Sequence, residues 1–402
     1  MQTRSTLGNP YITTAAYYLG FICLGMATAV LGPTLQGLAG NTNSTLAQIS
    51  SLFLVSSFGY LLGSFAAGRV FDRVKGHPIL SLALLMVASI LVVIPLIQKL
   101  LFLQVLFFII GIAESHLDVG INTLIVWLHG NRVPPFMNGL HAFYGIGTTT
   151  APLIVAAVIS TTGSLNSIYW ALSILFLPVA LLVLFSPSPS HIHSRQLAEE
   201  RPAVSVLVIL ITMIFFAFTG AELGFGGWIF TFTTSQVYGN PRLAASINAA
   251  FWAALTLGRV ISIPLAVKFK PQKILWVDFC GIIVSLLVII FFSSTEWLLW
   301  LGTIGTGLFM APTFPSLLND AQSRMHMSGK ITSFFFVGAS LGSMVIPWLM
   351  GQLIIPFGAT AVMIVVMCSI LVATGIFYIL NIVQRKTPAP PPHPSSAGKS
   401  EG

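Results

Sequence analysis

The chain has 402 residues, of which 55% are hydrophobic and only 7% are charged, and its mean hydropathy is +0.92. Soluble globular domains carry about 25% charged residues, so this composition excludes an ordinary soluble protein and indicates an all-α protein that crosses a membrane many times. The net charge of +8 does not indicate a nucleic-acid partner, because nearly all basic residues fall on one side of the predicted spans.

The hydrophobic runs divide into twelve segments, each close to the roughly 20 apolar residues that a helix needs to cross a bilayer. Arg259 lies within a span, Lys99 and Arg242 fall on one side, and the other fifteen of the eighteen Lys and Arg fall on the opposite side. By the positive-inside rule both termini are predicted to be cytoplasmic, and we expect the plasma (inner) membrane. The predicted spans are 12–34, 47–68, 78–98, 101–128, 137–160, 167–186, 203–232, 245–267, 273–293, 296–318, 329–355 and 357–384.

The loop after the second span reads Gly68-Arg-Val-Phe-Asp72-Arg73. Glycine lets helices approach closely, and Asp72 can cap or pair with a helix end whose shift opens a cytoplasmic gate, so we assign Gly68, Asp72 and Arg73 to gating. This string, between spans two and three of twelve, resembles the loop signature of the major facilitator superfamily, which implies two pseudo-symmetric bundles of six helices. Topology and contact with lipid headgroups explain the basic residues equally well.

The fourth span carries Glu114, Asp118 and Asn122 at intervals of four residues, so the three side chains share one helix face. A charged residue in mid-membrane costs about 2.5–3.5 kcal/mol on insertion scales, so such a stripe is expected to line a cavity or to bind a proton or an ion. Two carboxylates one turn apart cannot both ionise at low cost in a dry site, so we expect one to be protonated. For Glu114, a Na⁺ ligand and a protonated acid that donates to a backbone carbonyl are equally consistent.

Leu117-Asp-Val-Gly-Ile-Asn122, followed by Asn138-Gly-Leu-His-Ala-Phe-Tyr-Gly-Ile-Gly147, resembles the fucose permease branch and the related sodium-dependent glucose transporter-like proteins. The resemblance implies that Asp118 takes part in cation coupling and that Asn122 belongs to a sugar cavity. Fucose permease carries a second acid in its first span, whereas the first span here has none. That half of its coupling chemistry therefore does not transfer.

The fifth span presents Asn138, His141 and, beside the same stripe, Tyr144. Amide, imidazole and phenol groups can all hydrogen-bond the hydroxyls of a sugar, so we assign these three residues to substrate binding. His141 can also join a proton path, because histidine titrates near neutral pH. A hydrogen-bonded packing histidine is an equally good interpretation.

A polar, proline-bearing segment splits the spans into two sets of six. We predict an N-terminal bundle over 1–186, a cytoplasmic linker over 187–202 and a C-terminal bundle over 203–386. Across the linker the sequence repeats weakly at an offset near 190, as in Met137-Asn-Gly139 against Met327-Ser-Gly329. Repeats of this kind place a substrate site between the two halves, near the middle of the bilayer.

Glu222 lies in the seventh span, the repeat partner of the first, and is therefore the candidate for the acid that the first span lacks. A buried carboxyl group without a cation partner can exchange protons near neutral pH, and one supplied with further oxygens can bind Na⁺. We therefore assign ion coupling to Asp118 and Glu222. A fixed pair of either acid with Arg259, His116 or His141 is the structural alternative.

In the eighth span Asn248, Trp252 and Arg259 share a face. A sugar stacks its C–H face on an aromatic plate and needs donors and acceptors for its hydroxyls, so Asn248 and Trp252 are candidate substrate ligands. Packing explains a lone Trp equally well. Arg259 is expected to form a structural ion pair with Asp278 of the ninth span, with substrate contact as the alternative. Gln352 of the eleventh span is a further candidate sugar ligand.

No nucleotide-binding, hydrolase or metalloprotease motif occurs, and Cys23, Cys280 and Cys368 lie far apart, so we expect no catalytic residue, metal site or cofactor. The prediction is a monomeric secondary transporter that moves a hexose-like sugar with H⁺ or Na⁺ by alternating access. The alternatives are a proton-driven antiporter that exports amphipathic compounds and a membrane receptor that binds without moving its ligand. The segment 387–402, rich in Pro, Ser and Gly, is predicted to be a disordered cytoplasmic tail.

Overall fold

The structure, a computed structural model, describes residues 10–189, 206–236, 239–325, 327 and 329–386. Within these residues all regular secondary structure is helical, and twelve segments are long and apolar enough to cross a membrane. The expected all-α architecture of twelve spans is confirmed. Most of the predicted 187–202 linker and all of the predicted 387–402 tail lie outside the described residues.

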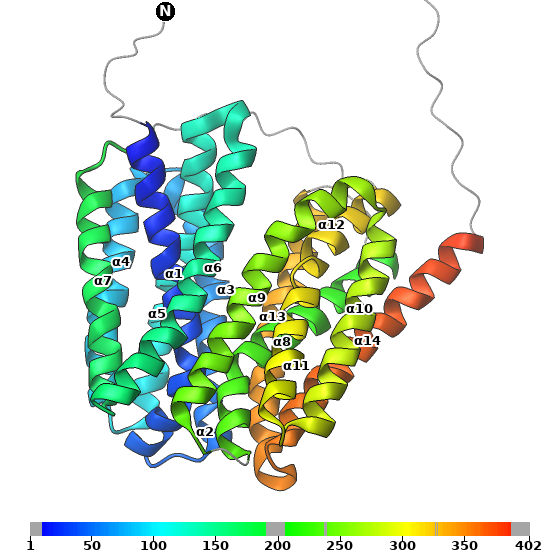
Figure 1. Ribbon diagram of the computed structural model, residues 1–402. Coiled ribbons are helices and arrows are strands. Elements are labelled where there is room, and N and C mark those ends of the chain that lie inside the picture. The colour runs from blue at the N-terminus through cyan, green and yellow to red at the C-terminus, as the bar shows by residue number, and fades with distance from the viewer. Residues whose placement is uncertain (1–9, 190–205, 237–238, 326, 328, 387–402) are drawn as a thin grey trace, which may run out of the picture.

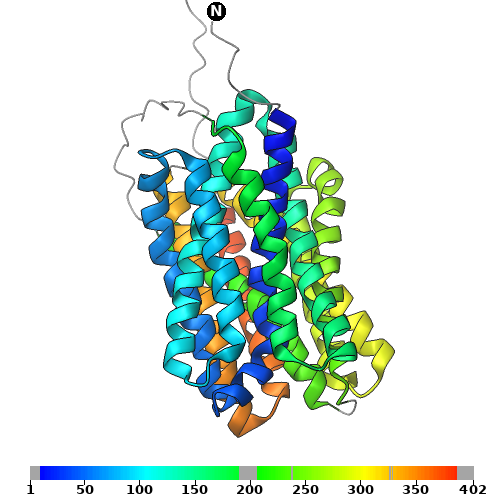
Figure 2. The ribbon, with the colours of Figure 1, turned by 90° about the vertical axis from the view of Figure 1, so that its left-hand side faces the viewer.

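The first six spans form one bundle, on the left of Figure 1, and Figure 2 shows from that side how its helices run next to one another. The second span begins with a separate short helix, α2, whose start is fixed by a capping box between Thr45 and Gln48. The elements are α1 Pro10–Asn41, α2 Leu46–Ile49, α3 Ser51–Phe71, α4 Gly76–Val93, the 3-10 helix η1 Ile94–Leu96, α5 Leu100–His129, the 3-10 helix η2 Gly130–Arg132, α6 Val133–Thr161 and α7 Leu165–Phe185.

The other six spans form the second bundle, on the right of Figure 1. The predicted span 296–318 is divided here into α11 and α12, because Pro312 has no N–H to donate and restricts the residue before it. The repeat partner of this span, α5, runs without a break, so the two halves differ at this point. The elements are α8 Val206–Ser235, α9 Pro241–Lys268, α10 Pro271–Phe292, α11 Glu296–Met310, α12 Thr313–Arg324, α13 Gly329–Phe357 and α14 Thr360–Lys386.

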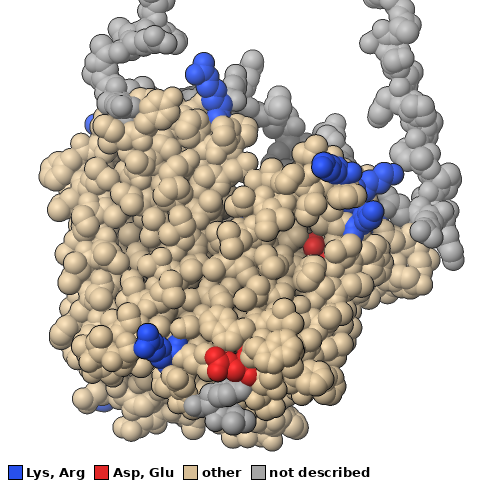
Figure 3. Space-filling model, in the orientation of Figure 1, with Lys and Arg blue, Asp and Glu red and all other residues tan. Residues whose placement is uncertain are grey.

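Basic side chains gather at the end of the bundles where α1 begins, at the top of Figure 3. We call this end the basic face and the opposite end the far face. Between them the flanks are covered by exposed apolar side chains such as Leu82, Ile174 and Val284, as expected for surfaces that face lipid. The basic face carries Arg69, Arg73, Lys75, Arg132, Lys268, Lys270, Lys273 and Arg324, whereas Lys99 and Arg242 lie toward the far face.

Glycine residues bring α3 and α5 into close contact. A Cβ atom added at Gly111 of α5 would clash with the backbone of α3, and one added at Gly59 or Gly63 of α3 would clash with α5. Small residues at such positions let two membrane helices approach until their backbones touch. The contact places Tyr60 of α3 beside Asp118 of α5, to which the Tyr60 hydroxyl donates a hydrogen bond.

Replacing Gly111 by Val is expected to lower the free energy of unfolding by about 1–3 kcal/mol, because the added methyl groups overpack the α3–α5 contact. Thermal unfolding of the detergent-purified protein measures this change. Gly375→Ala on α14 is the matched control, since a Cβ atom at Gly375 meets no atom within 4 Å. Equal stability of Gly111→Val and the wild type would contradict the close contact.

Contacts between the two bundles close their interface at the far face. Gln352 of α13 donates from Nε2 to the backbone carbonyl of Ala47 on α2 at 2.8 Å. Gly32 of α1 lies so close to α8 that an added Cβ atom would be 2.9 Å from the carbonyl oxygen of Gly227. A polar bridge and a glycine contact therefore join the two halves at this end of the molecule.

Candidate functional site

A cavity of about 880 Å³ lies between the two bundles. Its wall includes Phe53 and Gly227 at the closed far-face seam, and Ala266 and Asn319 near the basic ends of α9 and α12. The cavity therefore extends from the seam toward the basic face. Eight residues that the sequence singled out line it, namely Glu114, Asp118, Asn138, His141, Tyr144, Glu222, Trp252 and Arg259.

The carboxylate of Asp118 on α5 is held by two hydrogen bonds. Its Oδ2 accepts from the hydroxyl of Tyr60, and its Oδ1 accepts from Nδ2 of Asn122, one turn further along α5, at 2.8 Å. Asn122 also donates to the backbone carbonyl of Asp118 at 2.9 Å. Asn122 does not line the cavity, so the structure places it behind Asp118, which differs from its predicted place as a substrate ligand.

Tyr60 is a member of the site that was not predicted from the sequence. It lines the cavity and binds one of the two oxygens of Asp118. The signal that could have revealed it is the pair Gly59 and Gly63, because a helix face rich in glycine packs closely against a neighbour. A tyrosine on that segment is then within reach of polar groups on the facing helix.

Glu114 lies one turn before Asp118 and is only 7% exposed. It lines the cavity, but among the described residues its carboxylate has no hydrogen-bond or ion-pair partner. The predicted bond to a backbone carbonyl is thus absent from the described part of the chain. Glu114 and Asp118 share one wall of the cavity, but only Asp118 is fixed by neighbours.

Glu222 and Arg259 form an ion pair in the second bundle, in which Nη2 of Arg259 donates to Oε1 of Glu222 at 3.1 Å. The side chain of Glu222 is 7% exposed and that of Arg259 is 33% exposed, so the guanidinium group faces the cavity more than the acid does. Pairing of Glu222 with Arg259 is the structural alternative to a coupling role. It also corrects the expected pairing of Arg259 with Asp278.

Asp278 lies on α10 outside the cavity wall and is 3% exposed. Its Oδ2 accepts from the hydroxyl of Thr313, the first residue of α12, at 3.5 Å. The predicted Arg259–Asp278 pair was wrong because two residues near the same ends of successive helices can still point in different directions. Arg259 faces the cavity, whereas Asp278 faces the break between α11 and α12.

Exchanging the two charges in the double variant Glu222→Arg, Arg259→Glu is expected to recover part of the stability that either single variant loses. Breaking the pair should cost about 1–2 kcal/mol, below the range for fully buried pairs because Arg259 is partly exposed. Thermal unfolding in a double-mutant cycle measures the coupling. A cycle between Arg259→Gln and Asp278→Asn is the control, and energetic coupling there, with none between Arg259 and Glu222, would contradict the observed pairing.

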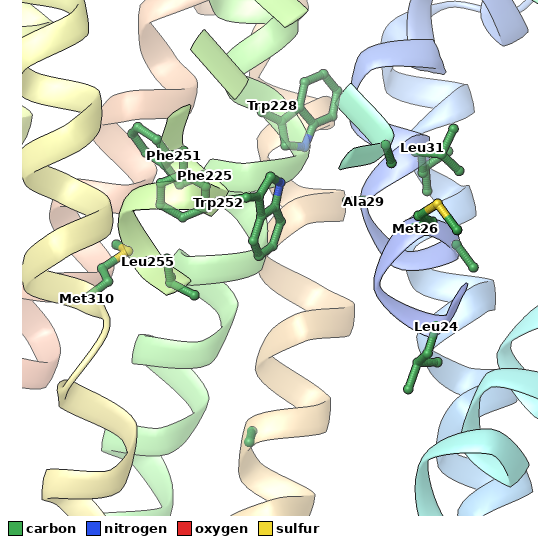
Figure 4. Packing of buried hydrophobic residues seen from close by; sticks show 14 of the residues in the cluster. Leu24, Met26, Ala29, Leu31, Phe225, Trp228, Phe251, Trp252, Leu255 and Met310 are labelled. Carbon is green, nitrogen blue, oxygen red and sulfur yellow. The ribbon is translucent and has the colours of Figure 1, made fainter. Parts of the chain in front are cut away.

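Trp252 of α9 is 4% exposed and lines the cavity, and Figure 4 shows it between α9 and α1. Its indole Nε1 has no hydrogen-bond partner among the described residues. A buried donor without an acceptor is costly, so this N–H is available to a ligand or to water. Asn248, one turn earlier, is fully buried and donates to the carbonyl of Gly226 at 2.6 Å. It does not line the cavity, which corrects its predicted place as a substrate ligand.

Asn138, His141 and Tyr144 of α6 all reach the cavity. His141 is exposed there, and its ring meets the ring of Phe21 edge-on with centroids 6.1 Å apart. Next to these residues α6 contacts α9 directly, because a Cβ atom added at Gly145 would clash with the side chain of Thr256. The polar groups of α6 therefore lie beside a tight contact between the two bundles.

Gln352 and the loop-signature residues lie outside the cavity wall. Gln352 is engaged at the far face, where it also donates to the hydroxyl of Ser50 at 3.2 Å, so its predicted place as a sugar ligand is corrected. Gly68, Asp72 and Arg73 are exposed at the basic face, where Asp72 ends α3. Asp72 forms no ion pair within the described residues, and the gating role of this loop stays a prediction.

The sequence model of the Major Facilitator Superfamily matches residues 17–347. The chain is 30% identical to sodium-dependent glucose transporter 1 of Xenopus laevis, over 82% of this chain and 73% of that protein. It is 29% identical to sodium-dependent glucose transporter 1A of Mus musculus, over 84% of this chain and 88% of that protein.

Solved structures of transporters share the fold. A mutant of the nucleoside transporter NupG gives a TM-score of 0.74 at 15% identity, and the match covers 92% of this chain and 99% of that one. A bacterial homologue of the human lysosomal transporter Spinster, in an inward-facing and unoccupied conformation, gives a TM-score of 0.70 at 13% identity, over 96% of this chain and 100% of that one.

Proposed function

The chain belongs to the Major Facilitator Superfamily, whose members are membrane transporters and not enzymes, and we propose that it is a secondary active transporter that moves a hexose-like sugar together with H⁺ or Na⁺. The observation that carries this proposal is the cavity between the bundles, in which the acids of α5 and the Trp252 and Arg259 side chains of α9 line one space. A sugar ligand is supported by the relatives, which are named glucose transporters.

The cavity has the size and the chemical groups that a hexose needs. Its volume of about 880 Å³ lies within the range of about 300–1,000 Å³ that is typical of small-molecule sites. Trp252 offers an aromatic face and an unpaired N–H, while Asn138 and His141 offer donors and acceptors from the opposite bundle. We therefore place the sugar between α6 and α9.

We assign cation coupling to the acids that line the cavity, with Asp118 as the main coupling acid and Glu114 beside it. Intramembrane acids are costly to retain, and in transporters they commonly serve ion binding or proton transfer. Glu222 is the third acid of the cavity, and its pair with Arg259 favours a structural part for it. Protonation or Na⁺ binding at the α5 acids would remove the negative charge that opposes closure of a dry cavity.

We infer the orientation from the distribution of basic residues. If the basic face is cytoplasmic, as the positive-inside rule expects, both termini are cytoplasmic and the cavity extends toward the cytoplasm of a plasma (inner) membrane. The far-face contacts of Gln352 and Gly32 then form the closed outer gate. Rocking of the two bundles, within a single monomer, would expose the same cavity to the other side.

The test is uptake of radiolabelled D-glucose into proteoliposomes under separately imposed pH and Na⁺ gradients. Accumulation above equilibrium under either gradient supports cation-coupled sugar transport. Uptake that only equilibrates, whichever gradient is present, would contradict the coupling. Binding of glucose without any uptake would instead favour a receptor.

An exporter of amphipathic compounds is the second candidate, and the aromatic part of the cavity wall favours it. The wall includes Phe21, Phe53, Phe107, Phe314 and Phe336, which suit an apolar ligand. A thermal-shift comparison separates the two functions. Stabilisation by hexoses supports the symporter, whereas stabilisation by hydrophobic organic cations alone supports the exporter.

A further inference from the structure

The three carboxyl groups of the cavity differ in what surrounds them. Asp118 accepts hydrogen bonds from Tyr60 and Asn122, one at each of its oxygens. Glu222 is paired with Arg259 at 3.1 Å. Glu114 is 7% exposed, and among the described residues its carboxylate is the one in the cavity without a hydrogen-bond or ion-pair partner.

Among the described residues, no cationic side chain on the helices that pack against α5 forms an ion pair with Glu114. The described part of α1 contains no acidic, basic or histidine residue, and the one such residue of α4, His77, lies outside the cavity wall and is bound to Tyr17 and to the carbonyl of Ser186 at 2.7 and 2.8 Å. Of the Lys and Arg residues that the structure describes, Arg259 alone lines the cavity, and Glu222 holds it. The titratable or charged groups of the cavity wall are Asp118 on α5, Tyr60 on α3, His141 and Tyr144 on α6, Glu222 on α8 and Arg259 on α9.

An ionised Glu114 would therefore be a nearly buried charge, one turn from a second acid and without a counter-charge. Binding of a single proton removes this charge and needs no ligand other than the carboxylate itself. Binding of Na⁺ needs several oxygens around one point. Neither Tyr60 nor Ser115 is fixed at the Glu114 carboxylate, since Tyr60 donates to Asp118 and Ser115 donates to the carbonyl of Ile112 at 2.7 Å.

We propose that Glu114 is the proton-binding residue of this transporter and that the coupling ion is H⁺, with Asp118 as a positioning residue that Tyr60 and Asn122 hold in place. The carboxylate of Glu114 takes up one proton when the cavity faces the outside and releases it when the cavity faces the cytoplasm. This inference rests on the proposed function, from which it differs by naming the ion and by moving the proton from Asp118 to Glu114. It also separates this chain from relatives that are named sodium-dependent.

Uptake of D-glucose into proteoliposomes tests the assignment. The proteins compared are the full-length wild type, Glu114→Gln, Glu114→Asp and the control Glu296→Gln. Glu296 is an exposed acid at the start of α11, on the far face. An inward gradient of about one pH unit can drive about tenfold accumulation if one proton enters with each sugar. We expect this accumulation in the wild type and the control, partial accumulation in Glu114→Asp and none in Glu114→Gln. Counterflow exchange, which needs no net proton movement, should persist in Glu114→Gln. Wild-type accumulation that follows Na⁺ instead of pH, or unchanged accumulation in Glu114→Gln, overturns the proposal.

Infrared difference spectra between acidic and alkaline buffer provide a second readout that does not depend on the substrate. The wild type should show the band of a protonated carboxyl group, and this band should be lost in Glu114→Gln and retained in Asp118→Asn. Loss in Asp118→Asn with retention in Glu114→Gln overturns the assignment. If the wild type does not transport glucose, the sugar proposal fails while the band still decides the role of Glu114. Size-exclusion chromatography checks that each variant is folded.

Discussion

Asp118→Ala is expected to reduce uptake by roughly 10- to 100-fold, because the partly buried hydroxyl of Tyr60 loses its acceptor at a cost of about 1–3 kcal/mol. Tyr60 donates to the Asp118 side chain and has no other hydrogen-bond acceptor among the described residues, whereas Asn122 keeps its bond to the backbone carbonyl of residue 118. The tyrosine is then free to leave the cavity wall. Initial rates of D-glucose uptake into proteoliposomes measure the effect.

Asp118→Asn is the informative companion of this variant. The oxygen of the new asparagine can accept from Tyr60. If the Asn122 amide rotates, its oxygen can accept from the asparagine N–H, so a much smaller loss of uptake is expected. Glu296→Ala is the control, because Glu296 is an exposed acid outside the cavity. Equal loss of uptake in Asp118→Ala and Asp118→Asn would show that the charge matters and not the hydrogen bonds, which would return the coupling role to Asp118.

The fold could be predicted from the sequence because a bilayer imposes a length and a composition on each span. Hydrophobic runs such as 101–128 match their helices within one residue, as α5 Leu100–His129 shows. The break between α11 and α12 was missed because the hydrophobic run continues across Pro312, and only the backbone chemistry of proline marks the interruption. Composition thus locates spans well and interruptions within them poorly.

The site was accessible where helical spacing places several polar groups on one face. Glu114 and Asp118 on α5, and His141 on α6, all reach the cavity because their spacing defines a stripe. Spacing does not define partners on other helices, since these depend on how far two helices approach and how each is rotated. For this reason Tyr60 was missed, and Arg259 was assigned to the wrong acid.

Gln352 shows a further limit of prediction from the sequence. As a polar residue of the eleventh span it was predicted to bind a sugar, but the second span begins with the separate short helix α2, which lies within reach of its amide. The amide is therefore engaged by α2 at the far face. A polar residue in a membrane helix can join two bundles as readily as it can bind a substrate, and sequence position alone does not distinguish the two.

Trp252→Ala is expected to raise the half-saturating glucose concentration by about 10- to 100-fold, because stacking and one hydrogen bond together contribute roughly 1.5–3 kcal/mol. Trp252 is 4% exposed, lines the cavity and carries an indole N–H that no described residue accepts. Trp252→Phe retains the aromatic face and loses the donor, so a change of only a few-fold is expected. Concentration-dependent uptake measures both variants.

Truncation of a buried tryptophan also opens a void, which typically costs about 3–5 kcal/mol of stability, so the affinity has to be separated from folding. Thermal unfolding without sugar reports the void, and the additional stabilisation that glucose provides reports binding. Trp228→Phe is the matched control, because Trp228 is fully buried at the far-face seam, outside the cavity wall, and donates to the carbonyl of Pro347 at 2.9 Å. If glucose stabilises Trp252→Ala as strongly as the wild type, the indole is a packing residue and the sugar lies elsewhere in the cavity.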